Sequence, residues 1–268
     1  MSEPSLAVSE RSDGGADVAR RIARIEAWLS RQITLEFEPC ALPRSGRTYR
    51  IAKPDQASRD RLFEEARQDS EKQMPHWAKI WASGVALADV VCERAEEVAG
   101  QQVLELGAGL GTTATAVLES GGSLVTADYS LLSLTLCRYN TLRNAARAPE
   151  CLRFNWRSEP PPLRPARREA GFSLILAADV LYEGRDIFPL LDLVQGLFTP
   201  GAQLWLAEPV RKTAQRFLDT AAAHGWQGTS RTVHGPWPDG TSDPVNIHFL
   251  SWTQRLDRLP ADLAGLRT

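Results

Sequence analysis

The stretch Val103-Leu104-Glu105-Leu106-Gly107-Ala108-Gly109-Leu110-Gly111 decides the fold of this chain. Its apolar first half predicts a short strand, and three glycines at alternate positions then predict a turn. The residues that follow predict a helix over 112–119. Because glycine has no Cβ, a strand that ends in such a turn lets the backbone lie directly against a nucleotide-like ligand.

The spacing of the glycines indicates which nucleotide-like ligand fits. A dinucleotide site requires G-x-G-x-x-G, but here the third glycine comes one residue early and Thr112 stands where that pattern needs glycine. The turn also lacks the G-K-[ST] sequence of a phosphate-binding P-loop. Glu105 would repel a pyrophosphate and suits a cationic ligand. The turn therefore resembles the first motif of class I S-adenosylmethionine (SAM) methyltransferases, whose cofactor carries a sulfonium and an ammonium group.

Composition and charge limit the class of protein. The chain has 268 residues, 43% of them hydrophobic, which fits one α/β domain with additions. A net charge of −2 gives no overall electrostatic reason to bind nucleic acid or a membrane surface. The apolar runs are too short to span a bilayer, and the acidic N-terminus does not resemble a secretory signal.

The cysteines and histidines are spaced unlike metal ligands. The four cysteines stand far apart without a C-x-x-C pair, which argues against a zinc site or a disulfide framework. We therefore expect no metal and a reduced, cytoplasmic enzyme. The four histidines have no ligand spacing and are expected to be surface or packing residues: His76, His224, His234 and His248.

Local patterns divide the chain into four parts. Residues 1–15 are rich in Ser, Glu and Gly and are expected to be disordered. Residues 16–73 predict an extension with helices and a β-hairpin, 74–255 a SAM-binding domain, and 256–268 a C-terminal tail. Within the domain, predicted strands at 103–106, 123–128, 151–154, 173–178 and 203–207 alternate with predicted helices at 112–119, 131–144, 187–198 and 213–224, and strands at 226–233 and 246–252 close the pattern.

This alternation favours the α/β class. Strands that alternate with helices form a largely parallel, Rossmann-like sheet with helices on both faces. The pattern resembles the seven-stranded methyltransferase sheet, in which the last strand runs antiparallel.

An acid follows the second strand of the domain. Asp128, with Tyr129 beside it, comes about 20 residues after the glycines, where a carboxylate can accept hydrogen bonds from both ribose hydroxyls. Asp is also a favoured helix N-cap, and a helix is predicted to begin just after it. The preceding glycine motif favours the ribose role. After the third strand, the indole of Trp156 could pack along an adenine face or fill the core.

A second acid ends the strand at 173–178. Ala178 is followed by Asp179, with Tyr182 three residues later, and the carboxyl ends of parallel strands are where open α/β sheets place their ligands. Methyl transfer from a sulfonium requires an aligned, uncharged nucleophile. A lysine amine has a pKa near 10.4 and is mostly protonated at neutral pH, so a carboxylate and a ring hydroxyl could hold it by its hydrogens. The alternative is that Asp179 caps a loop and Tyr182 packs in the core.

Together these motifs resemble family 16 of the seven-β-strand methyltransferases, which are protein lysine methyltransferases with a D-x-x-Y motif after the fourth strand. Trp81-Ala82-Ser83-Gly84 resembles the W-P/A-S-G segment of that family. The resemblance spans roughly residues 74–255. It implies that SAM contacts Trp81, Gly107, Ala108, Gly109, Asp128, Trp156 and Ala178, and that Asp179 and Tyr182 lie at the acceptor.

The predicted function is SAM-dependent N-methylation of a lysine in a protein. Methylation of a small molecule or of another protein nitrogen remains open, because this fold has many acceptors. A SAM-binding interaction protein without catalysis is a third possibility, although the presence of both Asp179 and Tyr182 counts against it.

Overall fold

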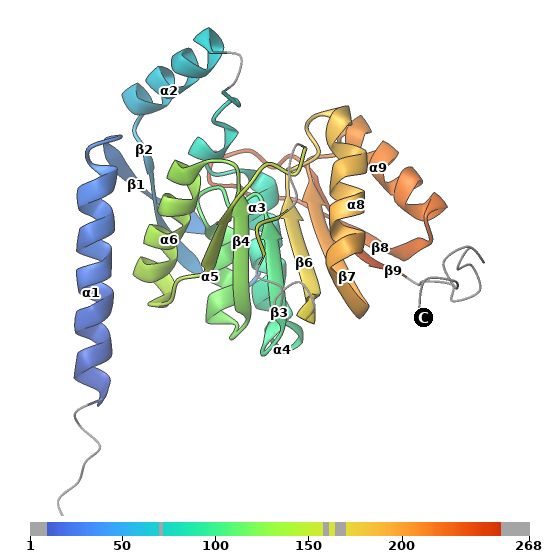
Figure 1. Ribbon diagram of the computed structural model, residues 1–268, viewed down its shortest axis with the longest axis horizontal. Coiled ribbons are helices and arrows are strands. Elements are labelled where there is room, and N and C mark those ends of the chain that lie inside the picture. Colours follow the sequence, from blue (N-terminus) through green and yellow to red (C-terminus); the bar gives the residue numbers. More distant parts are fainter. Residues whose placement is uncertain (1–9, 70–71, 158–160, 164–169, 253–268) are drawn as a thin grey trace, which may run out of the picture.

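A computed structural model describes residues 10–69, 72–157, 161–163 and 170–252, except for the side chains of residues 10–14 (Figure 1). Its centre is a seven-stranded sheet in the order β5-β4-β3-β6-β7-β9-β8. Strands β3 to β7 pair in parallel, and β9 runs antiparallel to both of its neighbours. This arrangement confirms the predicted Rossmann-like α/β fold with an antiparallel closing strand.

The first half of the sheet is built around the glycine turn. Strand β3 (Gln102–Leu106) passes through the turn into α5 (Thr112–Glu119), and β4 (Ser123–Asp128) leads into α6 (Leu131–Ala145). Strand β5 (Glu150–Arg153) forms the edge. In the parallel register Leu106 lies beside both Ala127 and Ala177, so β3, β4 and β6 end at the same side of the sheet.

The second half of the sheet comprises β6, β7 and a closing hairpin. Strand β6 (Phe172–Ala178) is followed by the short helix η2 (Gly184–Asp186), α8 (Ile187–Leu197), β7 (Phe198–Glu208) and α9 (Lys212–Ala223). Strands β8 (Trp226–Val233) and β9 (Val245–Trp252) form the closing hairpin. Strand β7 is longer than the predicted 203–207, because its irregular start at Phe198–Gly201 pairs with Phe172 across a register shift.

Helices cover both faces of the sheet, as Figure 1 shows. On one face Val103 and Leu176 share a core with α3 (Ala82–Glu93), α5 and α6. On the other face Leu104 and Ile175 share a second core with α8 and α9. Consecutive strand residues point to opposite faces, which is why these strands have apolar residues at nearly every position.

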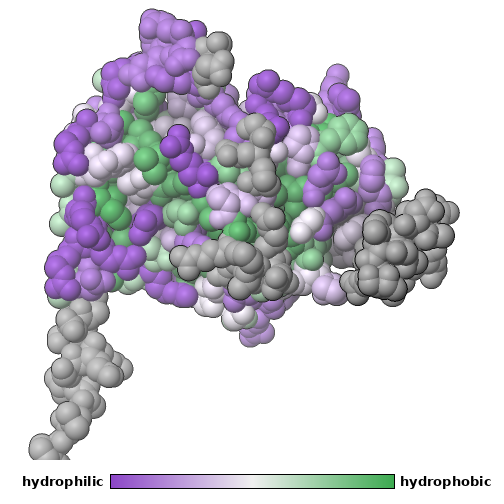
Figure 2. Space-filling view, viewed as in Figure 1, coloured by the Kyte–Doolittle hydropathy of each residue, from purple (hydrophilic) through white to green (hydrophobic). Residues whose placement is uncertain are grey.

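The N-terminal extension covers α6. Helix α1 (Glu10–Leu29) packs on α6, where Tyr139 donates a hydrogen bond to Glu26 (2.9 Å). The hairpin of β1 (Leu35–Ala41) and β2 (Thr48–Pro54) is fixed by the Asn140 amide, which bonds both backbone groups of Ala52. Helix α2 (Gln56–Gln68) follows, and Figure 2 shows it covered with hydrophilic side chains.

One prediction for this region differs from the structure. Residues 10–15 were expected to be disordered but form the first turns of α1, and residues 1–9 lie outside the described part, as does the tail at 256–268. Helix α2 begins at Gln56 because Asp55 caps it by accepting from the Ser58 N–H. Between α2 and β3 the chain forms η1 (His76–Ala78), α3 and α4 (Ala95–Val98).

The described residues contain neither a membrane-spanning helix nor a metal-binding cluster. Within that part of the chain, no helix is both long and apolar enough to cross a bilayer. Nor does it contain a cluster of His, Cys, Asp or Glu side chains arranged to hold a metal ion.

Candidate active site

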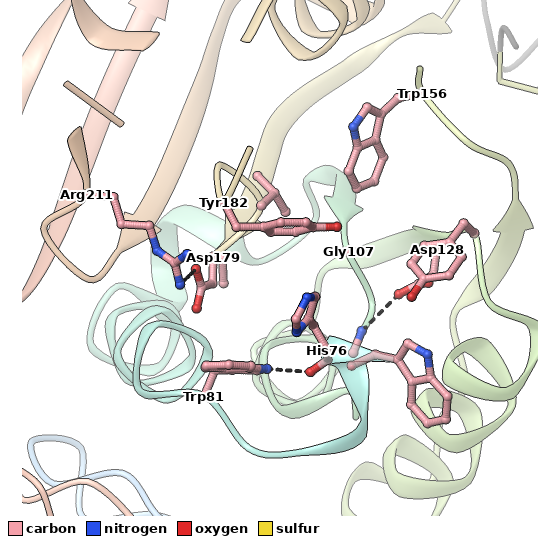
Figure 3. A pocket seen from close by; sticks show the side chains of 13 residues that line it. His76, Trp81, Gly107, Asp128, Trp156, Asp179, Tyr182 and Arg211 are labelled. Carbon is pink, nitrogen blue, oxygen red and sulfur yellow. Dashed lines mark hydrogen bonds and ion pairs between the residues drawn. The ribbon is translucent and has the colours of Figure 1, made fainter. Parts of the chain in front are cut away.

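A pocket opens at the carboxyl ends of β3, β4, β6 and β7, where an open α/β sheet places its ligand (Figure 3). A smaller pocket adjoins it and shares Trp81, Gly107, Gly109 and Ala178 with it. The two pockets together bring in every predicted site residue. Those residues are Trp81, Glu105, Gly107, Ala108, Gly109, Asp128, Tyr129, Trp156, Ala178, Asp179 and Tyr182.

The glycine turn forms the floor shared by these pockets. Gly107, Gly109 and Gly111 all have positive φ, at 82°, 51° and 82°. A Cβ on Gly111 would lie 2.9 Å from the Cα of Cys137 on α6, so only glycine lets the turn approach that helix. A Cβ on Gly107 would meet Val180 at 3.0 Å. The turn therefore presents bare backbone to the pocket on one side and packs on α6 and Val180 on the other.

Asp128 is buried at the end of β4 and faces the pocket. Its Oδ2 accepts from the Gly109 N–H (3.3 Å) and the Ser133 hydroxyl (2.7 Å), and its Oδ1 accepts from the Ser130 N–H (2.9 Å). The N-cap of α6 is Ser130, so Asp128 is not the cap that was considered as its alternative role. Burial raises the pKa of Asp128 to about 6, and these hydrogen bonds oppose the rise.

Glu105 lies deeper, in the smaller pocket beneath the glycine turn. It is 4% exposed and accepts a hydrogen bond from Thr126 (2.6 Å). Burial raises its pKa to about 8. Without a bound cation, Glu105 is therefore mostly neutral at pH 7, and the negative charge expected from the sequence develops only when a cationic ligand favours ionisation.

Aromatic side chains form the walls. The Trp81 indole donates to the His76 carbonyl (2.6 Å), the Tyr129 hydroxyl donates to the Met74 carbonyl (2.8 Å), and Lys79 lies 3.7 Å from the centre of the Trp81 ring. The Tyr129 bond fixes the segment that precedes α3 to the end of β4, and the other two contacts lie within that segment.

Trp156 is held from the opposite side of the pocket. Its indole donates to Asp186 (3.1 Å), which is fully buried in η2. Arg157 binds both carboxylate oxygens of Asp186 (2.5 and 2.7 Å) and also contacts Glu183 (3.1 Å). The loop that follows β5 is thus tied to the loop that carries Tyr182.

Asp179 projects into the pocket from the end of β6. Its φ of 55° is unusual for a residue other than glycine, and its N–H is fixed by the Ala207 carbonyl of β7 (2.9 Å). Burial raises the pKa of the Asp179 carboxyl to about 6, while Arg211, 2.8 Å away, and Lys79 oppose the rise. At pH 7 the group is a mostly ionised carboxylate in a largely dehydrated position.

Tyr182 stands beside Asp179 in the same pocket (Figure 3). Its ring makes an edge contact with His76, with centroids 5.3 Å apart. Burial raises the pKa of its hydroxyl to about 12, so the group stays protonated and can both donate and accept a hydrogen bond.

The sequence analysis missed four residues that line this pocket: His76, Trp77, Val180 and Arg211. His76, expected on the surface or in packing, lies between Trp81 and Tyr182. Burial and then Arg211 lower its pKa, so its ring is neutral at pH 7. Trp77 and Arg211 had no assigned role either. The aromatic cluster at 76–81 was a usable signal, whereas Arg211 had none, because only the sheet order brings the end of β7 beside the end of β6.

The fold and the site define a class I methyltransferase, in which a glycine turn with the buried carboxylate of Asp128 lies beside the carboxylate of Asp179. The chain belongs to the lysine methyltransferase family, whose model matches residues 65–223. This match confirms the family predicted from the motifs, and with it SAM as the methyl donor.

Named relatives agree with this assignment. The chain is 32% identical over 172 residues to an electron transfer flavoprotein beta subunit lysine methyltransferase of Danio rerio, covering 63% of this chain and 61% of that protein. A human protein of the same name is 41% identical over 54 residues, 20% of this chain and 21% of its own length. The chain thus spans about three fifths or less of these relatives.

A putative RNA methyltransferase from Pyrococcus horikoshii has the same fold, with a TM-score of 0.51 at 13% identity. The match covers 74% of this chain and all of that one. At this identity the likeness concerns the fold alone.

Proposed function

We propose that this protein transfers a methyl group from SAM to the side-chain amine of a lysine in a protein. The observation that carries the proposal is the position of Asp179, a dehydrated carboxylate that shares one pocket with Gly107, Gly109 and Tyr182. Family membership and the names of the relatives support the same reaction.

The described residues fit the cofactor. Asp128 accepts three hydrogen bonds and has acceptor capacity left for a ribose hydroxyl, since a carboxylate offers about four lone-pair sites. Trp156 and Tyr129 provide flat surfaces for the adenine. In the smaller pocket Glu105 faces the ammonium group of the methionine part of SAM. Lys79 lines the same pocket and can pair with the carboxylate of that methionine part. The bare backbone of the glycine turn lets that part lie close.

On the acceptor side, the chain orients an amine. Bound SAM supplies a methyl group made electrophilic by its sulfonium. Asp179 and the Tyr182 hydroxyl hold the lysine nitrogen by its hydrogens, so that its lone pair points at the methyl carbon. The lysine ammonium would first lose one proton to solvent, because only the neutral amine has a free lone pair, and the C–N bond would then form as the S–C bond breaks.

We also propose a cytoplasmic enzyme in which residues 74–255 form the catalytic unit and 16–73 cover α6. All four cysteines are free in the structure, which supports a reducing compartment. A protein acceptor, rather than nucleic acid or a membrane, is supported by the family and by the net charge of −2.

The test is transfer of labelled methyl from SAM into a lysate whose endogenous methylation has been depleted. Label in discrete protein bands, located on lysine by mass spectrometry, is the expected result. Label only in small metabolites would support the small-molecule alternative, and SAM binding without transfer to any acceptor would support a non-catalytic role. Because of the relatives' names, a purified electron transfer flavoprotein beta subunit is the first defined acceptor to test.

A further inference from the structure

Arg211 occupies the place that the proposed function gives to the substrate's ammonium. Its Nη2 lies 2.8 Å from Oδ1 of Asp179, and the two side chains are 33% and 10% exposed. Both line the pocket, and Figure 3 shows the guanidinium reaching Asp179 from the side opposite Trp156. A lysine that binds Asp179 must therefore displace Arg211 or share the carboxylate with it.

Hydrogen bonds to Glu208 fix the segment that carries Arg211. The N–H of Arg211 donates to Oε2 of buried Glu208 (2.6 Å), while Oε1 accepts from Asn246 (3.0 Å) and lies 3.3 Å from His248 Nε2. Between them Val210 has a φ of 54°, in the left-handed region that a β-branched residue rarely adopts. A strained backbone of this kind persists only where the surrounding structure imposes it. Here the strained conformation of Val210 directs the Arg211 side chain towards the Asp179 carboxylate.

Arg211 has no ready second partner on its own segment. Glu208, the carboxylate nearest in sequence, is already used by the backbone of Arg211 and by the two β9 side chains. Among the described residues, the other charged or titratable groups around Asp179 are Lys79 and Glu208, whose charges act on its carboxyl in opposite directions, and Tyr182 and His76, which are neutral; Glu183 acts on His76. Displacing Arg211 would remove the ion pair that this partly buried cation now makes, so a new carboxylate at the same place would be favoured.

We infer that Asp179 and Arg211 form an exchangeable ion pair, and that the enzyme selects lysines that lie beside an acidic residue of the substrate. When the lysine takes Asp179, the neighbouring carboxylate takes the guanidinium of Arg211, which binds a carboxylate through two parallel hydrogen bonds. Both ion pairs are then satisfied in the complex. Arg211 acts as a positioning and specificity residue, and this inference rests on the proposed lysine methylation.

The experiment compares methylation sites made in a depleted lysate by the wild type, R211M, R211K and the control K212M. Lys212 is the next residue, is exposed, and loses the same charge without touching Asp179. We expect wild-type sites to be enriched roughly threefold in Asp or Glu within three residues of the lysine, or within contact distance in the folded substrate. K212M keeps this enrichment, R211M loses it, and R211K keeps only part of it, because lysine retains the charge but not the two parallel hydrogen bonds.

A defined substrate taken from that experiment then gives a double-mutant cycle. Replacing its neighbouring acid by the amide lowers wild-type kcat/KM about tenfold, the effect of one charge-assisted hydrogen bond, mainly through KM. The same replacement has no effect on the kcat/KM of R211M. In that variant the fall of kcat/KM on the acid side moves to higher pH, because Asp179 has lost the cation that lowers its pKa. The substrate replacement tests the wild type even if R211M does not fold.

The outcomes separate the failure of this inference from that of the proposed function. Lysine methylation without acidic enrichment, or R211M and K212M with the same site preference, overturns the exchange and leaves lysine methylation intact. A lower kcat in R211M with an unchanged preference also overturns it, since that indicates a merely structural role. If the wild type methylates no lysine at all, the proposed function fails, and the inference fails with it.

Discussion

Replacing Glu105 by glutamine should stabilise the protein and weaken its cofactor binding. In the folded chain without SAM, Glu105 is buried beneath the glycine turn and its pKa is raised from 4.5 to about 8. Between these values the folded state keeps a proton that the unfolded state has lost. The contribution of Glu105 to stability is therefore fully present below pH 4.5 and is lost as the pH rises towards 8.

The size of the effect follows from the width of this window. Each pH unit costs about 1.4 kcal/mol, so at pH 7 the cost reaches about 3 kcal/mol of the free energy of unfolding. The amide of the E105Q variant would stay neutral and could still accept the hydrogen bond from Thr126. We expect E105Q to match the wild type near pH 4.5 and to exceed it by about 3 kcal/mol at pH 7.

Urea unfolding at pH 5, 6, 7 and 8 without SAM measures this difference, with E96Q on exposed α4 as the control for loss of a charge. Calorimetry in buffers of different ionisation enthalpy measures the protons released when SAM binds. The wild type should release more protons than E105Q, because Glu105 ionises on binding. The Kd of E105Q for SAM should rise at least tenfold, because the ammonium loses its carboxylate. A stability difference that does not change with pH, or an E105Q protein less stable at pH 7, would show that Glu105 is already ionised and refute the reasoning.

Four other changes test the remaining parts of the site. D179N should lower kcat by about 100-fold or more while the Kd for SAM stays within about threefold, because the amine loses its anchor but the cofactor does not; loss of SAM binding would mean that the residue is misplaced. Wild-type kcat/KM should fall as the pH drops through about 6, the pKa of Asp179, and this limb should be absent in D179N. D128A should raise the Kd for SAM at least tenfold. The control S133A removes one hydrogen bond to the same carboxylate and should lower only the Tm. Equal Kd values for D128A and wild type would refute the ribose role. Y182F should lower kcat about tenfold with SAM binding unchanged, since only the hydroxyl is lost. D186N should cost about 3 kcal/mol of stability by leaving Arg157 without its buried partner, and it should raise the KM for SAM by freeing Trp156; an unchanged KM would separate that network from the cofactor.

Local patterns were enough to predict the central elements. Helix α5 and strand β4 have the predicted bounds, and β3 differs by one residue, because each is a short apolar segment limited by glycine or polar residues. The motifs at Gly107, Asp128 and Asp179 were predicted to share one site because the carboxyl ends of parallel strands meet at one edge of a sheet. The ends of other elements were less predictable, since Asp55 starts α2 through a side-chain bond that apolar periodicity does not show.

By itself, the sequence determined the fold class and most of the pocket residues, and its motifs carried the resemblance that gave the family and the cofactor. The fold class and those pocket residues follow from apolar periodicity, glycine spacing and the residue that ends each strand, which act over short distances along the chain. Only the tertiary structure decided the charge state of Glu105, the contact of His76 with Tyr182, and the pairing of Arg211 with Asp179. The reason is physical: burial and ion pairing depend on which distant segments meet, and the ends of β6 and β7 meet because the sheet places those two strands side by side.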